Sequence, residues 1–332
     1  MFFSRSRALV LLTCAALLAA LLLPTASSMA QTRLKVVATF SILGDWVANV
    51  AADKVDLTVL VGAGSDTHTY EPGPADSAAL SEADLIFEIG AEFETWLDAL
   101  VEASGTKAKR IVLTEGIELL PLESHEHEHE HEHKHESKDA DMHHGGEGDK
   151  EGEHEHGEFD PHVWHDVSLV MKMVERIRDA LIEADPANAE SYTLQASLYL
   201  AELGLLDGEL LLAVDEIPEA RRILITTHRS LAYFGARYSF KVDSALGVTT
   251  EAADPSAGEI AELIERVKAS GVPAIFADNV SNPRLMEQIA REAGVKLAPP
   301  LFTDALGEKG SEGETYVKMM RYNLRTIIEA LK

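Results

Sequence analysis

The chain has 332 residues, of which 46% are hydrophobic and 26% charged, a composition typical of a folded protein. Its formal net charge is −27. This charge argues against nucleic-acid binding, which needs a basic surface, and against electrostatic attachment to an anionic membrane. A cation is the partner that the charge favours.

Residues 1–30 have the pattern of a secretory signal peptide. Arg5 and Arg7 precede an apolar run from Ala8 to Leu23, and Ser28-Met29-Ala30 has the small-x-small pattern that signal peptidase accepts. The run is shorter than the roughly 20 residues of a membrane helix. We therefore predict secretion across the inner membrane, to the periplasm or the extracytoplasmic surface.

Cys14 is the one cysteine of the chain and lies inside this apolar run. Thr13 before it fits poorly with a lipoprotein signal, which favours cleavage over a lipid anchor. Without Cys14 the secreted chain has no thiol, so any transition metal must be held by imidazole and carboxylate groups.

Short β-branched runs alternate with amphipathic stretches, which predicts an α/β fold of mainly parallel sheets covered by helices. The expected strands are 34–39, 56–61, 84–89, 110–113, 222–227, 241–245, 274–278 and 296–301. The expected helices are 42–52, 75–82, 92–103, 167–184, 188–215, 257–270, 283–293 and 313–331. Four strands in each half predict two similar lobes, each with a four-stranded sheet.

The domain boundaries follow from this order. We expect an N-terminal α/β lobe at 31–186, a long rigid connecting helix at 187–217 and a C-terminal α/β lobe at 218–332. Pro186 and Pro218 bound the connecting helix.

Residues 124–158 form an insert of unusual composition within the first lobe. They hold 10 of the chain's 14 histidines, with 13 acidic residues and 3 lysines. Such a segment cannot bury enough apolar surface to offset the entropy of ordering, so we expect it to be disordered. Its imidazoles are expected to bind zinc weakly, for capture or sensing; the alternative is a solvated acidic loop with incidental affinity.

Outside the insert the histidines are His68, His162, His165 and His228. His68 follows the second expected strand, His228 the fifth, and Asp304 the eighth. Ligands of open α/β sheets bind beyond the carboxyl ends of the strands, so these three side chains are expected at a cleft between the lobes. One histidine near a strand end is more often a loop or capping residue, but several together favour a metal site.

Three imidazoles and one carboxylate are suited to a borderline metal. Zinc accepts tetrahedral nitrogen and oxygen ligands, with Zn–N distances of about 2.0–2.1 Å. Imidazole also suits copper, nickel and iron, whereas manganese prefers more oxygen ligands.

Five segments together resemble the metal-specific solute-binding proteins of ABC importers. The segments are HTYEPGPAD (68–76), DPHVWHD (160–166), TTHRSLAYFGARYSF (226–240), TEAADPSAGEI (250–260) and LFTDALG (301–307). They are most similar to the zinc-binding branch, the ZnuA- and AztC-like proteins of cluster A-I. The resemblance implies two α/β lobes joined by a rigid helix, with one metal between them.

The resemblance also implies that His68, His162, His228 and Asp304 are the metal ligands. Manganese binders resemble this pattern with glutamate at the third position, whereas zinc binders have histidine there. His228 therefore indicates zinc, and the replacement of a hard oxygen by nitrogen agrees with that reading.

Five further residues have weaker interpretations. For His165 three interpretations stay open: a group that orients a metal ligand, a transient ligand, or a helix-start residue. Asp66 and Glu71 could orient the ring of His68, although ordinary loop acidity explains them equally well. Trp164 and Tyr233 are interpreted as packing for the cleft walls.

The predicted function is an extracytoplasmic zinc-binding protein, not an enzyme, that delivers Zn²⁺ to an ABC permease. It is expected to be a monomer, and a periplasmic zinc chaperone is a further candidate partner. Alternatives are a manganese or iron carrier on the same scaffold, a zinc hydrolase, and a buffering or adhesive surface protein. The hydrolase is disfavoured because the chain has no GxSxG motif, and its HExxH matches fall only in the low-complexity HEHEH repeats of the insert.

Overall fold

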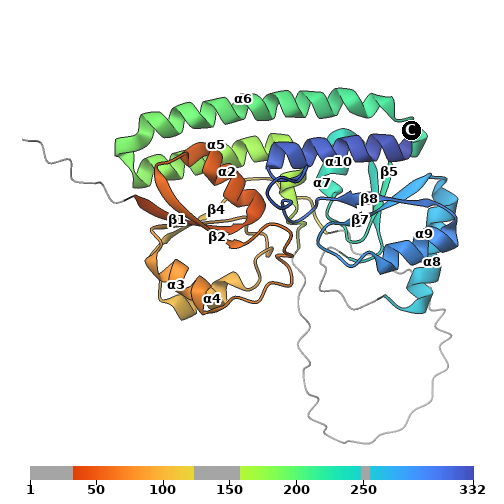
Figure 1. The fold of residues 1–332 in the computed structure, drawn as a ribbon, viewed down its shortest axis with the longest axis horizontal. Coiled ribbons are helices and arrows are strands. Elements are labelled where there is room, and N and C mark those ends of the chain that lie inside the picture. Colours follow the sequence, from red (N-terminus) through yellow and green to blue (C-terminus); the bar gives the residue numbers. More distant parts are fainter. Residues whose placement is uncertain (1–32, 123–157, 248–254) are drawn as a thin grey trace, which may run out of the picture. The chain divides into compact units, whose positions relative to one another are not determined.

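The computed structural model describes residues 33–122, 158–247 and 255–332 (Figure 1). The expected signal peptide and nearly all of the histidine-rich insert lie outside the described residues, as does the first part of the segment 250–260. Leu34–Lys332 form one compact unit. Within the described part of the chain, no helix combines the length and the apolar character needed to span a bilayer.

The strands agree closely with the sequence prediction. They are β1 (Leu34–Phe40), β2 (Val55–Val61), β3 (Leu85–Glu88), β4 (Lys109–Val112), β5 (Ile223–Thr226), β6 (Lys241–Ser244), β7 (Ala274–Asp278) and β8 (Lys296–Leu301). The first four form a parallel sheet in the order β2-β1-β3-β4. The fold is α/β, with parallel sheets, flanking helices and one long helix, as expected.

The α-helices are α2 (Ser41–Ala51), α3 (Pro74–Glu82), α4 (Leu97–Ser104), α5 (Val167–Ala184), α6 (Ala189–Ala213), α7 (Ala232–Tyr238), α8 (Ala257–Ser270), α9 (Arg284–Ala293) and α10 (Tyr316–Leu331). Short 3-10 turns are η1 (Val163–His165), η2 (Pro186–Asn188), η3 (Val214–Glu216) and η4 (Glu219–Arg221). A capping box begins α8, since the backbone amides of Ser256 and Glu259 each donate to the other residue's side chain.

Two details differ from the sequence prediction in the helices. The sequence predicts a helix from residue 92, whereas α4 begins at Leu97. Gly90, Ala91 and Glu92 have φ of 78°, 52° and 59°, which a right-handed helix cannot contain. The other detail is α7, which was not expected because its sequence is short and rich in aromatic residues.

The second half does not form one continuous four-stranded sheet. Within the described residues, β5 pairs with β6 and β7 pairs with β8, as two separate parallel ladders. Between β5 and β7, the amide of Asp278 donates to the side-chain hydroxyl of Thr227 at 3.2 Å. A side chain thus takes the place of a backbone acceptor where the two ladders meet.

The alternation of strand residues divides the core of the first half into two layers. Val36, Ala38 and Phe40 of β1 belong to the main core cluster. Val37, between them, belongs to a smaller cluster that includes residues of α3 and α4. Because successive side chains of a strand point to opposite faces, helices cover both faces of this sheet.

Helix α6 is the long helix predicted between the two halves. It packs on α2 and α5 from the first half and on α10 from the second, as Figure 1 shows. The amide of Tyr316 at the start of α10 donates to Asp45 of α2 at 3.1 Å, which also ties the halves together. The division into lobes at 31–186 and 218–332 remains a prediction.

Candidate metal site

Four side chains from distant parts of the sequence meet at one buried point. Each of His68, His162, His228 and Asp304 offers one potential ligand atom, and these four atoms all lie within 4.8 Å of one another. The four side chains, called the His3Asp cluster below, are at most 4% exposed. They are the four residues that the sequence predicted as ligands.

His68 is positioned by the loop that follows β2. Its backbone amide donates to Asp66 Oδ1 at 2.9 Å, and its ring packs edge-on against Phe93 with centroids 5.0 Å apart. The amide of Gly64 donates to the carbonyl of Leu306 at 2.8 Å. This bond joins the loop of His68 to the loop of Asp304.

His162 lies in a turn directly before η1 and α5. Asp160 Oδ1 accepts from the His162 backbone amide at 2.9 Å and lies 2.8 Å from its ring Nδ1. Trp164 fixes the other side of the turn, since its indole Nε1 donates to the carbonyl of Thr303 at 2.7 Å. Asp166 then caps α5 by accepting from the amide of Ser168.

His228 lies just beyond the carboxyl end of β5, beside the end of β7. Asp278 is the last residue of β7, and its Oδ2 lies 2.6 Å from His228 Nδ1. The same oxygen accepts from the His228 backbone amide at 3.2 Å. One carboxylate therefore fixes both the backbone and the ring of this histidine.

Asp304 follows β8 and completes the cluster. Its Oδ2 lies 2.9 Å from His228 Nε2, and its Oδ1 lies 3.5 Å from His162 Nε2. The Nε2 atoms of His68 and His162 are 3.3 Å apart. Three nitrogens and one carboxylate thus face a common centre.

The hydrogen bonds at Nδ1 determine what the Nε2 atoms offer. A neutral imidazole that donates its Nδ1 proton to a carboxylate has a lone pair on Nε2. Asp160 places His162 in this arrangement, and Asp278 does the same for His228 once a metal has displaced the second proton of that ring. Among the described residues, His228 Nε2 and Asp304 Oδ1 are buried without a hydrogen-bond partner. Such orphaned polar atoms are costly unless another group satisfies them, which a cation would do.

The electrostatics of the cluster also favour a cation. Burial opposes the charged form of Asp304, but the imidazoles of His228, His162 and His68 outweigh it and hold its pKa well below the ordinary value. Burial, with repulsion from the other two imidazoles, lowers the pKa of His68 to about 3, so its ring is neutral. For His228 burial is outweighed by Asp304 and Asp278, which raise its pKa well above the ordinary value. A metal must displace that proton.

His165 lies beside the cluster but is not part of it. It is the last residue of η1, at the start of α5, and it is fully buried. Both ring nitrogens lack a hydrogen-bond partner among the described residues. Burial lowers its pKa to about 3, so this ring too is neutral. The helix-start interpretation describes its position correctly.

The other interpreted residues have distinct surroundings. Asp66 accepts a hydrogen bond from the backbone amide of His68, and Glu71 is exposed. Trp164 and Tyr233 are buried, as expected for packing residues. Both also donate a hydrogen bond to a backbone carbonyl. Trp164 donates to Thr303 at 2.7 Å, and the Tyr233 hydroxyl donates to Asp160 at 2.8 Å.

Sequence reasoning did not identify Asp160 and Asp278 as ring partners. A signal was present for each. Asp160 stands two residues before His162, a spacing that lets one carboxylate reach both the amide and the ring. Asp278 ends a buried strand, where polar side chains gather at the carboxyl edge of parallel sheets.

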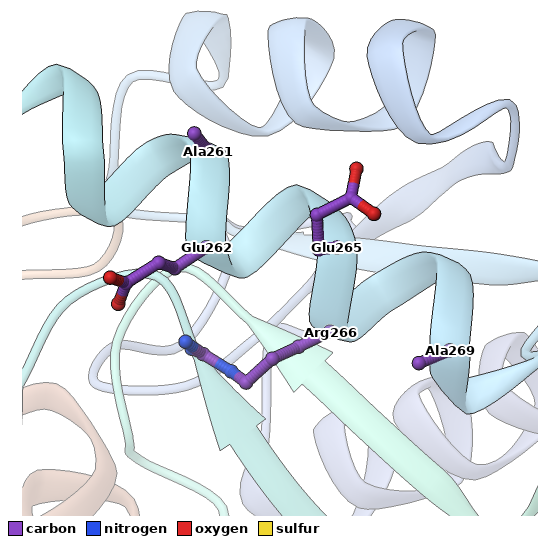
Figure 2. Close-up of a pocket in the computed structure, with 5 residues that line it drawn as sticks. All are labelled: Ala261, Glu262, Glu265, Arg266 and Ala269. Atoms are coloured by element: carbon purple, nitrogen blue, oxygen red, sulfur yellow. The ribbon is translucent and has the colours of Figure 1, made fainter.

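A surface hollow elsewhere has no relation to the cluster. Figure 2 shows its five lining residues, all on α8: Ala261, Glu262, Glu265, Arg266 and Ala269. Arg266 forms a salt bridge with Asp243, with Nε and Oδ2 3.0 Å apart. Because the His3Asp cluster is closed and buried, it forms no open pocket of this kind.

Comparison with known proteins agrees with the site and the fold. The family described as zinc-uptake complex component A, periplasmic (ZnuA), matches residues 36–330. The chain belongs to this family. ZnuA-family proteins are the substrate-binding components of metal ABC transporters and are not enzymes, so this chain has a permease as its partner.

Relatives of this ZnuA-family chain carry names that refer to two metals. It is 33% identical to the manganese-binding lipoprotein MntA of Halalkalibacterium halodurans, over 90% of this chain and 88% of the relative. It is 31% identical to the manganese ABC transporter substrate-binding lipoprotein PsaA of Streptococcus anginosus, over 90% and 89%. Its structure matches the periplasmic zinc-binding protein TroA of Treponema pallidum with a TM-score of 0.76 and 28% identity, covering 90% and 99%.

We predict that replacing His165 by leucine reduces the acid sensitivity of the metal-free protein. A histidine whose pKa falls on folding leaves the unfolded chain binding more protons. Stability is therefore lost as the pH drops below about 6.5, by up to about 1.4 kcal/mol per pH unit. Urea unfolding at pH 7 and pH 5, with chelator, should show the wild type losing about 2 kcal/mol more than the variant. Equal losses in both proteins would contradict the burial of a neutral His165.

Proposed function

We propose that this ZnuA-family protein captures Zn²⁺ as its cargo and delivers it to the permease of an ABC importer. The proposed ligands are the Nε2 atoms of His68, His162 and His228 and the carboxylate of Asp304. The observation that carries the proposal is their convergence within 4.8 Å at a buried point. We further propose a periplasmic or extracytoplasmic location, in line with relatives named as lipoproteins.

The spacing of the donor atoms supports a single bound ion. A tetrahedral zinc site with bonds of about 2.0–2.1 Å has its ligand atoms roughly 3.3 Å apart. Three separations between donor atoms of the cluster are 2.9, 3.3 and 3.5 Å, within an overall span of 4.8 Å. The side chains are thus already arranged at coordination distances, which limits the reorganisation that binding requires.

Zinc is favoured over manganese by the identity of the donors. Three imidazoles and one carboxylate supply more nitrogen than manganese prefers, whereas zinc accepts this set readily. The names of the manganese-binding relatives support the alternative of a manganese carrier. The residue that distinguishes the two alternatives is His228, a nitrogen donor at the third position.

Burial of the cluster implies that metal release needs a movement. The four side chains are almost completely covered, so the loops after β2 and β8, which the Gly64–Leu306 bond joins, would have to separate. A permease that binds the metal-loaded and the metal-free forms differently can drive this change. The lobes expected from the sequence would then draw together modestly around the metal.

The histidine-rich insert is proposed as a weak accessory zinc binder that is dispensable for the cluster. Its two ends are held next to each other: the amide of Leu122 donates to the carbonyl of Glu158 at 3.0 Å, and that of Asp160 to Leu120 at 2.9 Å. A short link could therefore replace residues 124–157 without disturbing His162. Transfer of zinc from a periplasmic chaperone remains a further part of the proposal.

A zinc hydrolase is disfavoured by the same geometry. Catalytic zinc keeps one position open for water beside three protein ligands. Here a fourth protein group, Asp304, faces the same centre as the three histidines.

We predict that replacing His228 by alanine weakens zinc binding at least about 100-fold, because one of four donors and its Asp278-fixed orientation are lost. Zinc titration against a chelating competitor measures the change. Replacing the exposed Glu71 by glutamine is the matched control and should leave the affinity within about twofold. Unchanged affinity in the His228 variant would remove this residue from the site.

We predict that replacing His228 by glutamate shifts the preference from zinc toward manganese. An oxygen donor suits manganese better than imidazole does, so zinc affinity should fall at least about tenfold more than manganese affinity. Competition between the two metals, in wild type and variant, measures the ratio directly. A wild-type protein that already prefers manganese would support the alternative function instead.

A further inference from the structure

The outer face of α6 carries an exposed stripe of leucines. Within the described residues, six large hydrophobic side chains are exposed, and five of them are leucines of this helix. They are Leu194, Leu198, Leu205, Leu211 and Leu212, with exposed fractions of 57%, 59%, 73%, 43% and 77%. Helix α6 packs on α2, α5 and α10 (Figure 1), and the leucines of the stripe stay exposed outside these contacts.

The stripe has the spacing of a coiled-coil seam. Leu198, Leu205 and Leu212 recur every seven residues, and Leu194, Ala201 and Gly208 occupy the alternate heptad position between them. Other side chains of the helix, such as Tyr199 and Leu206, are buried in the core of this chain. The seam is therefore additional to the packing that holds α6 in place.

Two glycines near the middle of the seam are not required by packing among the described residues. Apart from the neighbouring backbone of α6 itself, a side-chain carbon added at Gly204 or Gly208 would meet no described atom within 4 Å, and neither has a positive φ. Glycine is the least favourable residue of a helix interior apart from proline. Their presence in α6 is explained if another backbone approaches the helix from outside the chain.

We propose that this seam, Leu194 to Leu212, is the interface of a concentration-dependent antiparallel homodimer, in place of the monomer expected from the sequence. In an antiparallel pair centred near Leu203, the two central layers each pair a large residue of one copy with a small residue of the other, and the outer layers pair Leu194 with Leu212. Leu198 faces Gly208 of the second copy, and Leu205 faces Ala201. The stripe is thus complementary to itself, which is the requirement for a twofold-symmetric interface.

The residues flanking the seam fit the same arrangement. Leu211 would pack over Ser197 of the second copy, whose hydroxyl is already satisfied by the carbonyl of Thr193 at 2.7 Å. On one side Gly204 meets Gly204 of the second copy, which lets the helices approach closely. On the other side Glu202 meets Glu202, so the copies repel each other weakly.

Size and charge identify a second copy as the occupant. The leucines together expose on the order of 500 Å², the size at which apolar patches mark interaction sites. A standard interface takes about 800 Å² from each partner, so this seam and its flanks fit a moderate, concentration-dependent dimer. Helix α6 contains acidic residues but no lysine or arginine, which disfavours an anionic membrane as the partner.

The test is sedimentation velocity of residues 31–332 from 1 to 200 µM, at low and high salt. We expect a monomer–dimer equilibrium that strengthens with salt, since both copies are acidic and the contact is apolar. Leu205→Glu should weaken association at least tenfold. Ala261→Glu, at an exposed position of α8, adds the same charge elsewhere and should associate like the wild type.

Gly204→Ala provides a test that folding defects cannot mimic. Alanine stabilises the helix of the monomer and should raise its thermal midpoint, yet its methyl group blocks the close approach and should weaken the dimer. A wild type that stays monomeric at 200 µM in high salt would overturn the proposal. So would association that Leu205→Glu leaves unchanged, or binding to zwitterionic vesicles that Leu205→Glu abolishes.

Discussion

The hydrogen bonds that two imidazole rings donate to two buried carboxylates are the interaction on which the site depends. Asp160 and Asp278 lie at the Nδ1 atoms of His162 and His228 and so orient the Nε2 atoms of both rings toward Asp304. Each carboxylate also holds the backbone amide of its histidine. Ring orientation and loop conformation are therefore fixed together, before any ion is bound.

The fold supplies the convergence of these groups. Three of the four side chains of the cluster follow strands of parallel sheets. The loops at the carboxyl ends of β2, β5 and β8 bring these side chains to the same point. Direct bonds between loops, such as Gly64 to Leu306, then connect the first half of the chain to the second. Helix α6 packs on both halves, which limits how far they can separate.

Much of this arrangement could be predicted from sequence, because strand ends and motif spacing are local signals. The strands were placed within one or two residues, and the four residues predicted as ligands are the ones that meet at one point, while their binding of a metal stays a prediction. The left-handed residues Gly90 to Glu92 and the side-chain link from Asp278 to Thr227 could not be predicted, because both depend on tertiary contacts. The partners Asp160 and Asp278 were missed because an acidic residue near a histidine in sequence or at a strand end does not reveal which atom it contacts. The choice between zinc and manganese also depends on small differences between donors rather than on the fold.

X-ray absorption spectroscopy of the protein loaded with one equivalent of zinc tests the central claim most directly. Four ligands at about 2.0–2.1 Å, with the outer-shell scattering of three imidazoles and no sulfur, are the result that the His3Asp cluster predicts. The same measurement on a variant without residues 124–157 should give the same spectrum. A six-coordinate environment made mostly of oxygen, or a signal that disappears with the insert, would show that the four side chains do not share the ion.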